Sequence, residues 1–269
     1  MELILTFALF LSSLLAALFG IGGGTLYTPI QLWLGVPFKE ASSLSLFLIL
    51  ITSVSSTIVY RKAHKVDWKL AMVLEIPTAA GAFLGGFFSH LFSNTFLSYF
   101  LIVILVLSGI FMIFSAKTKE TYSFKLKEIK NKKWFWKRKW NENGKELFYY
   151  IDIRIAVPIM FSVGVIISIL GISGGVFKVP IMIGLFKIPL PIAIGSSALM
   201  VGISASAGFL GHATIGNVNW HNILILFIPV FIGARLGSHL SSHTKAEKIK
   251  EYYGYFLFGV AFITFLKII

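Results

Sequence analysis

The chain contains no cysteine among its 269 residues. This absence excludes disulfides, thiolate metal sites and any mechanism that carries a sulfur atom on a cysteine. Charged residues are also scarce, at 13%, where a soluble domain has about 25%. The sequence offers no paired intramembrane carboxylates, no HExxH motif and no Ser/His/Asp arrangement that can be placed together. We therefore expect no catalytic residues, no cofactor and no metal site, and hence no enzyme.

Apolar residues dominate what is present. They make up 57% of the chain, and the mean hydropathy is +0.84. Stretches long enough to span a bilayer recur from one end to the other, and one water-soluble core could not absorb them all. The composition predicts a multi-pass protein of the plasma (inner) membrane.

Each half of the chain reads as five apolar segments. They cover residues 3–19, 25–36, 41–60, 70–91 and 96–116, then 155–170, 176–188, 192–213, 222–240 and 252–269. The second segment of each half is short, about 12 residues against the roughly 20 of a full span. Each first-and-second pair is therefore either two tilted spans or a hairpin that turns inside the membrane.

The two halves share one pattern of glycine, proline and serine. The matched elements are Gly20–Gly24 with Gly171–Gly175, Pro29 with Pro180, Ser42–Ser43 with Ser196–Ser197, Val66–Trp68 with Val218–Trp220, and Pro77, Gly81 and Gly85 with Pro229, Gly233 and Gly237. An internal repeat in a membrane chain is typical of a transporter whose site lies at the repeat interface. The predicted domains are a transmembrane repeat over 1–116, a basic cytoplasmic loop over 117–153 and a second repeat over 154–269.

The distribution of Lys and Arg predicts the orientation. Half of the 24 lie between residues 117 and 154, and further clusters lie at 61–65 and 241–251. The connections at 92–95 and 214–221 have none. The positive-inside rule then places the basic segments in the cytoplasm and both termini outside, provided each half crosses an odd number of times. The predicted fold is an all-α polytopic membrane protein of two inverted repeats, with short Gly-initiated broken helices meeting near the midplane.

The excess of Lys and Arg over Asp and Glu indicates which kinds of partner the chain binds. The 117–153 loop carries tryptophans among its lysines, which suits anionic lipid headgroups better than nucleic acid. We expect no nucleic-acid partner. The sequence leaves the oligomeric state open, a homo-oligomer included.

The glycine clusters are the first candidate site. A short helix that starts at such a cluster presents N–H donors and the positive end of its dipole, and so attracts an anion without a charged side chain. The alternative is close helix packing. The candidates are Gly22, Gly23, Gly24, Ser173, Gly174 and Gly175.

Two ionisable residues lie inside apolar runs. Lys178 follows the second glycine cluster, where the first half has Tyr27. It either attracts the anion or extends to the interface. Glu75 is a candidate for carrying a coupled proton, because burial raises the pKa of a carboxyl. It could equally pair with Lys178 or Arg235, or lie near the inner interface.

The remaining candidates are polar residues near segment ends. Serine hydroxyls at the start of the third segments either donate to an anion or bond their own helix. These are Ser42, Ser43, Ser196 and Ser197. His212 is a candidate for gating or proton transfer, or a satisfied polar residue. Arg235 faces a cavity or the cytoplasmic rim. We read Gly81/Gly85 and Gly233/Gly237 as packing faces.

These elements together resemble the TauE/SafE family of sulfite and organosulfonate exporters. The resemblance rests on a Gly-Ile-Gly-Gly-Gly-like cluster with a following proline in each half, and on Asp67-Trp68 and Asn219-Trp220 ahead of the paired glycines. It covers nearly the whole chain except the 117–153 loop. It implies a membrane permease for sulfite, sulfonates or related anions. Ser173 and Asn219 replace the family's usual Gly and Asp, and Lys178 stands where apolar residues are common.

Three functions are compatible with the sequence. The first is a secondary transporter that holds a small inorganic or organic anion at the two glycine-cluster helix N-termini, with proton coupling as an option. The second is a passive anion channel that shares this site. The third is a docking subunit or intramembrane enzyme that acts through the 117–153 loop.

Overall fold

The computed structural model describes residues 2–18, 25–117, 134–142, 145–216, 218, 220–242 and 246–268. Within these residues the chain forms ten α-helices, one short 3-10 helix and a β-hairpin. They are α1 (Glu2–Leu18), α2 (Tyr27–Trp33), α3 (Phe38–Lys62), α4 (Trp68–Phe88), η1 (Ser89–Leu91), α5 (Asn94–Lys117), β1 (Phe135–Glu142), β2 (Lys145–Asp152), α6 (Ile153–Leu170), α7 (Gly175–Gly184), α8 (Leu190–Thr214), α9 (Trp220–Ser242) and α10 (Ala246–Ile268). The ten apolar segments expected from the sequence are thus all helices.

Six of the described helices are long and apolar enough to cross a membrane: α3, α4, α5, α6, α8 and α9. The short second segments are not. α2 has 7 residues and α7 has 10, which at 1.5 Å per residue gives lengths of about 10 and 15 Å against a hydrocarbon core of about 30 Å. Each is therefore too short to cross the hydrocarbon core by itself.

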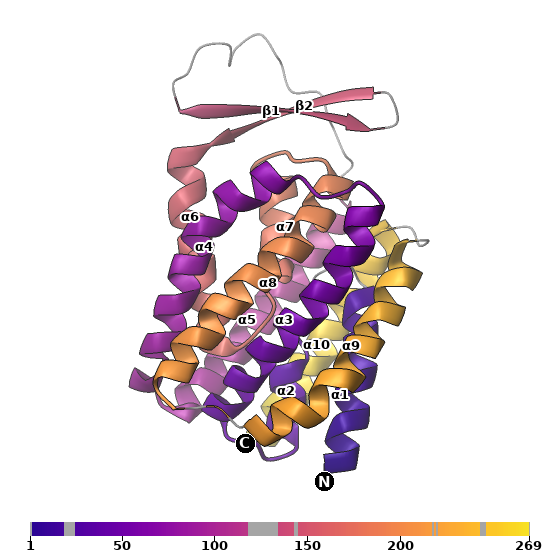
Figure 1. The fold of residues 1–269 in the computed structure, drawn as a ribbon. Coiled ribbons are helices and arrows are strands. Elements are labelled where there is room, and N and C mark those ends of the chain that lie inside the picture. Colours follow the sequence, from indigo (N-terminus) through magenta and orange to yellow (C-terminus); the bar gives the residue numbers. More distant parts are fainter. Residues whose placement is uncertain are drawn as a thin grey trace.

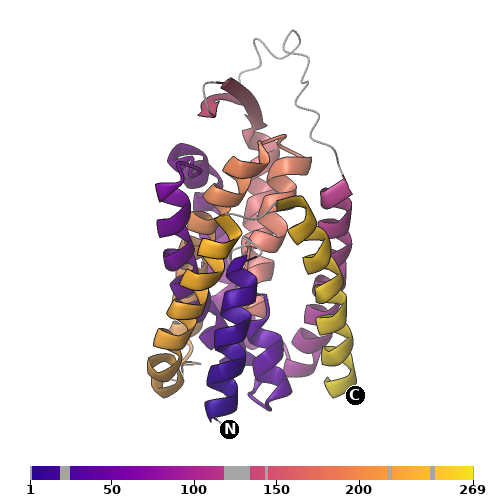
Figure 2. The ribbon, with the colours of Figure 1, turned by 90° about the vertical axis from the view of Figure 1, so that its right-hand side faces the viewer.

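The helices run along one common direction, with the β-hairpin across one end and both termini at the other (Figure 1, Figure 2). α1 starts at the terminal end, whereas α6 starts directly beneath the hairpin (Figure 1). The basic segment and the termini therefore lie at opposite ends of the bundle, which is the relation that the charge pattern predicts.

Helix packing repeats between the halves. α4 packs on α6 and α8, and α9 packs on α1 and α3 in the same way. α2 lies on α3 and α7 on α8, while α3 pairs with α8 and α5 with α10. Each of these contacts thus has its counterpart, or is its own, when the two halves are exchanged. This pattern, with the opposite starting ends of α1 and α6, supports the interpretation of inverted repeats.

The backbone repeats as well. α3 and α8 both follow a proline, Pro37 and Pro189, and both run for 25 residues. Left-handed residues recur at the same interval of 152, at Gly35 and Lys187 and again at His64 and Gly216. This interval aligns Ser197 with Ser45, so the sequence pairing of Ser42–Ser43 with Ser196–Ser197 is shifted by two residues.

Gly81, Gly85 and Gly233 lie on packing faces, as expected. A Cβ at Gly81 or Gly85 would overlap the backbone of α6 at Phe161 or Val165. A Cβ at Gly233 would meet α1 at Phe10 and Ser13. Small residues let these helix backbones approach closely, which stabilises helix pairs in lipid.

The basic 117–153 segment contains structure that the sequence reading missed. β1 and β2 pair in antiparallel register from Phe135 opposite Asp152 to Glu142 opposite Lys145, and β2 leads straight into α6. Residues on the two faces of a strand alternate. Lys137 and Lys139 are exposed, while Tyr149 and Ile151 are buried against the bundle. The alternation of buried and exposed residues covers only two short strands with many charged residues. It is therefore a weak sequence signal, and the hairpin was not predicted.

Candidate functional site

The second glycine cluster turns the chain between α6 and α7. Gly171 has φ +63°, and the N–H of Ile172 donates to the carbonyl of Ile167 at 3.0 Å, a Schellman ending for α6. A Cβ at Gly171 would overlap Ser42 of α3. Glycine is required here twice, for the left-handed backbone and for the close approach of α3.

The turn is tied to the first half of the chain. The hydroxyl of Thr28 in α2 donates to the carbonyl of Gly171 at 2.7 Å. The N–H of Gly175 donates to the Ser173 hydroxyl at 3.3 Å, and α7 begins there. The positive end of the α7 dipole therefore lies inside the bundle, held by α2 and α3.

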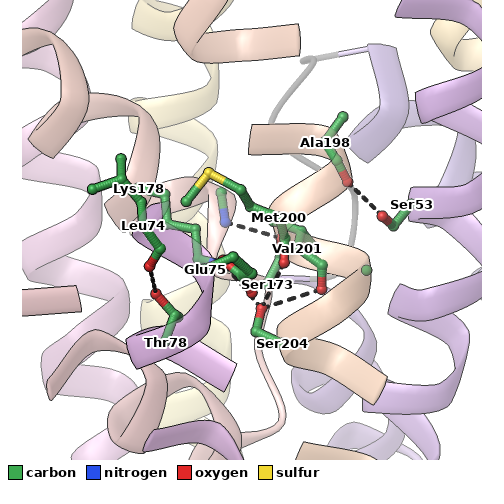
Figure 3. Close-up of polar contacts among 12 residues, drawn as sticks. Ser53, Leu74, Glu75, Thr78, Ser173, Lys178, Ala198, Met200, Val201 and Ser204 are labelled. Carbon is green, nitrogen blue, oxygen red and sulfur yellow. Dashed lines mark hydrogen bonds and ion pairs between the residues drawn. The ribbon is translucent and has the colours of Figure 1, made fainter. Parts of the chain in front are cut away.

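Lys178 lies in the first turn of α7 and carries the central contacts of the site. Its Nζ donates to Oε2 of Glu75 at 2.7 Å and to Oγ of Ser204 at 2.9 Å (Figure 3). A Cβ built on Gly174 would lie 3.0 Å from Cε and 3.4 Å from Nζ of Lys178. The side chain therefore folds back toward the N-terminus of its own helix, where the ammonium and the helix dipole both attract negative charge.

This ion pair is buried. The side chains of Lys178 and Glu75 are 0% and 1% exposed. A charge at the centre of a spanning helix costs at least about 2.5–3.5 kcal/mol, so such residues are paired and mark pathways for substrates or protons. Oε1 of Glu75 has no hydrogen-bond partner among the described residues. The Glu75 carboxylate thus neutralises the ammonium close to the N-terminus of α7.

Three helices supply the site: α4 with Glu75, α7 with Lys178 and α8 with Ser204. The Ser204 hydroxyl donates to the carbonyl of Met200 at 3.1 Å and accepts from Lys178. The sequence reading named Glu75 and Lys178, and named their pairing as one option. It missed Ser204, which only the packing of α8 brings to them.

The first half has a neutral version of the same contact. Tyr27 and Thr52 correspond to Lys178 and Ser204, and their hydroxyls lie 2.6 Å apart. The residue at the position of Glu75 in the second half is Phe227. Among the described residues the buried ionised side chains are Asp67, Glu75 and Lys178. The charged site, which joins Glu75 of the first half to Lys178 of the second, therefore has an uncharged counterpart.

Among the described residues, none of the four predicted serines hydrogen-bonds to Lys178 or Glu75. Ser42 donates to the carbonyl of Lys39 at 3.1 Å and lies against Gly171. Ser196 accepts the N–H of Asp67 at 3.0 Å. Ser43 and Ser197 are buried, and their hydroxyls have no partner among the described residues. Of the predicted glycines, Gly22, Gly23 and Gly24 lie outside the described residues.

His212 and Arg235 lie apart from the ion pair. His212 is buried, with Nε2 3.0 Å from the carbonyl of Ser168 and Nδ1 3.4 Å from the Ser89 hydroxyl. It ties α8 to α6 and η1. Arg235 is exposed on the side of α9 that also presents Ile232 and Leu236. The structure therefore does not bring either residue to Glu75.

A helical bundle with membrane-length spans, two helices too short to span and one buried ion pair at a helix start has the architecture of a multi-pass membrane transporter. The family model described as "Sulfite exporter TauE/SafE" matches residues 5–264. The chain belongs to this family of membrane transporters.

Two curated relatives agree with the class. The chain is 26% identical over 241 residues to "Probable membrane transporter protein YunE" of Bacillus subtilis (strain 168), covering 87% of this chain and 86% of the relative. It is 29% identical over 113 residues to "Probable membrane transporter protein MJ0441" of Methanocaldococcus jannaschii, covering 40% of each. No solved structure matches the chain.

Proposed function

We propose that this chain is a secondary transporter for a small sulfur-containing anion such as sulfite, which binds at the start of α7. The observation that carries the proposal is the fully buried Lys178–Glu75 pair. The anion replaces the Glu75 carboxylate as the partner of the Lys178 ammonium. Ser204 holds the ammonium in place by accepting from it, and the α7 N-terminus supplies further donors.

Charge balance couples the anion to a proton. In the structure the ammonium and the carboxylate cancel. A singly charged anion that enters adds an uncompensated negative charge to a dry site, which is strongly unfavourable. Protonation of Glu75 removes that charge and frees Lys178. Anion and proton therefore bind together, and each raises the affinity for the other.

The repeat supports alternating exposure of this one site. Two halves with matched helix pairs can exchange roles by rocking against each other around a fixed midplane site. Because the first-half contact is the neutral Tyr27–Thr52 pair, one anion binds per chain.

The test is sulfite flux into proteoliposomes, with and without an inward proton gradient, with sulfate, sulfoacetate and taurine as competitors. We expect saturable flux that the gradient drives. Lys178→Met abolishes it, and the matched control Lys69→Met, at an exposed position, does not. Glu75→Gln, which mimics the protonated acid, retains anion exchange and loses the response to the gradient.

Two results would reject the proposal. A sulfite flux in Lys178→Met equal to that of the wild type would show that the anion does not bind at Lys178. Flux that rises linearly with sulfite and ignores the gradient would identify a passive channel instead.

A further inference from the structure

The β-hairpin covers the end of the same three helices that form the ion-pair site (Figure 1). Tyr149 and Ile151 of β2 belong to one hydrophobic cluster with residues of α4, α7 and α8. This cluster includes Leu74 and Val179, the chain neighbours of Glu75 and Lys178. The hairpin is thus joined to the site by continuous packing.

Asp67, the N-cap of α4, fastens the hairpin to the bundle. Arg138 of β1 donates from Nη2 to Oδ1 at 2.6 Å and to Oδ2 at 2.8 Å, and from Nε to Oδ2 at 3.2 Å. The Tyr149 hydroxyl donates to Oδ2 at 2.5 Å. Asp67 is 2% exposed. Planar guanidinium–carboxylate pairing of this kind is strong and directional.

The same aspartate reaches the site helices through its backbone and cap. Its Oδ1 accepts the N–H of Leu70 at 3.1 Å, and its N–H donates to the Ser196 hydroxyl of α8 at 3.0 Å. Glu75 lies eight residues further along α4, about 12 Å away along the helix. A change at Asp67 is therefore transmitted to α4 and α8 together.

We propose that the hairpin is a lid over the ion-pair site, latched by Asp67 with Arg138 and Tyr149. Release of the latch opens the route between the site and the hairpin end of the bundle. A polar latch on an otherwise apolar contact suits a reversible closure, because the desolvation cost of a buried ion pair offsets much of its attraction. The proposal rests on the transport function proposed above and adds how access on one side is controlled.

The natural absence of cysteine permits a direct test. Met200 is fully buried on α8, one turn from Ser204 toward the hairpin end, so Met200→Cys reports access to the site. We would measure its reaction rate with a bulky hydrophilic maleimide in detergent. Adding Asp67→Asn, which keeps an N-cap acceptor, or Arg138→Met should raise the rate at least tenfold. The control Asp152→Asn alters the Asp152–Arg154 pair at the end of the same hairpin, in which the Arg154 side chain is 55% exposed, and should leave the rate unchanged.

A second reporter separates lid opening from unfolding. Leu105→Cys is buried on α5, in a cluster away from the hairpin, and its rate should not change with the latch variants. If labelling accelerates at both cysteines, a cross-linked protein distinguishes lid opening from unfolding. In Asp67→Cys/Arg138→Cys, a bis-methanethiosulfonate cross-linker, which forms a disulfide with each cysteine, should lower sulfite flux at least tenfold, and reduction should restore it.

Unchanged Met200→Cys labelling in folded latch variants would overturn the lid, as would full flux through the cross-linked protein. The labelling needs no substrate. If the wild type moves no sulfite, the proposed function fails while the labelling still accepts or rejects the lid.

Discussion

Glu75→Gln should make the protein depend on an external anion for its stability. The substitution removes the only carboxylate that Lys178 contacts among the described residues and leaves the ammonium buried. Removal of one partner from a buried pair costs roughly 3–5 kcal/mol. For a chain of this size, about 2–4 °C per kcal/mol, the apparent melting temperature falls by on the order of 10 °C.

Sulfite should restore much of this loss, because it binds in place of the missing carboxylate. At a concentration of about 100 times Kd, binding adds roughly 2.7 kcal/mol. In the wild type Glu75 competes for Lys178, so the same concentration stabilises less at neutral pH. The assay is thermal unfolding in detergent over a sulfite series, with chloride at equal ionic strength as the reference.

The double variant Glu75→Gln/Lys178→Met separates charge from binding. It removes both charges, so it should melt near the wild type and above either single variant. It should not respond to sulfite, since the ammonium is gone. Equal sulfite stabilisation of wild type, Glu75→Gln and the double variant would refute the site.

Three further predictions concern single contacts. Gly171→Ala should destabilise by about 2–5 kcal/mol, from left-handed strain and overlap with α3, whereas Gly184→Ala, with open space around it, should change thermal unfolding by less than about 1 kcal/mol. Ser204→Ala removes an acceptor from the Lys178 ammonium, worth roughly 1.5–3 kcal/mol, and should raise KM for sulfite; a normal KM would contradict this. Burial and the bond to Asp67 raise the pKa of Tyr149 above its usual range. Its stabilisation is therefore fully present below the unfolded pKa of about 10 and is lost only as pH rises through the higher folded pKa. Tyr149→Phe should cost the same at pH 6 and pH 9 in thermal unfolding; a cost that differs between the two would show that the hydroxyl titrates.

Much of the fold could be predicted because its signals are local. Apolar length located all ten helices, and Pro37, Pro189 and Asp67 mark helix starts through their backbone preferences. The β-hairpin could not be predicted, since β1 alternates over few residues and its inward face includes a charged residue, Arg138. The serine pairing is shifted by two residues because it compares residue types alone. The correct register depends on where α3 and α8 begin, which only the structure shows.

The site was half visible in the sequence. Lys178 and Glu75 stand out because charge inside an apolar run is unfavourable. Ser204 does not, because serines are ordinary in membrane helices and bond their own backbone. Once the halves are aligned, Ser204 can be told from other serines because its counterpart Thr52 hydrogen-bonds to Tyr27, the counterpart of Lys178.

The sequence by itself determined the membrane class, the helices and the family resemblance, because hydrophobic length, glycine and proline act within a few residues of the chain. Only the tertiary structure decided that Lys178 meets Glu75, 103 residues away, and that Asp67 fastens a hairpin 71 residues on. Such partners are chosen by how helix backbones pack, and the packing depends on small-residue faces distributed over the whole chain.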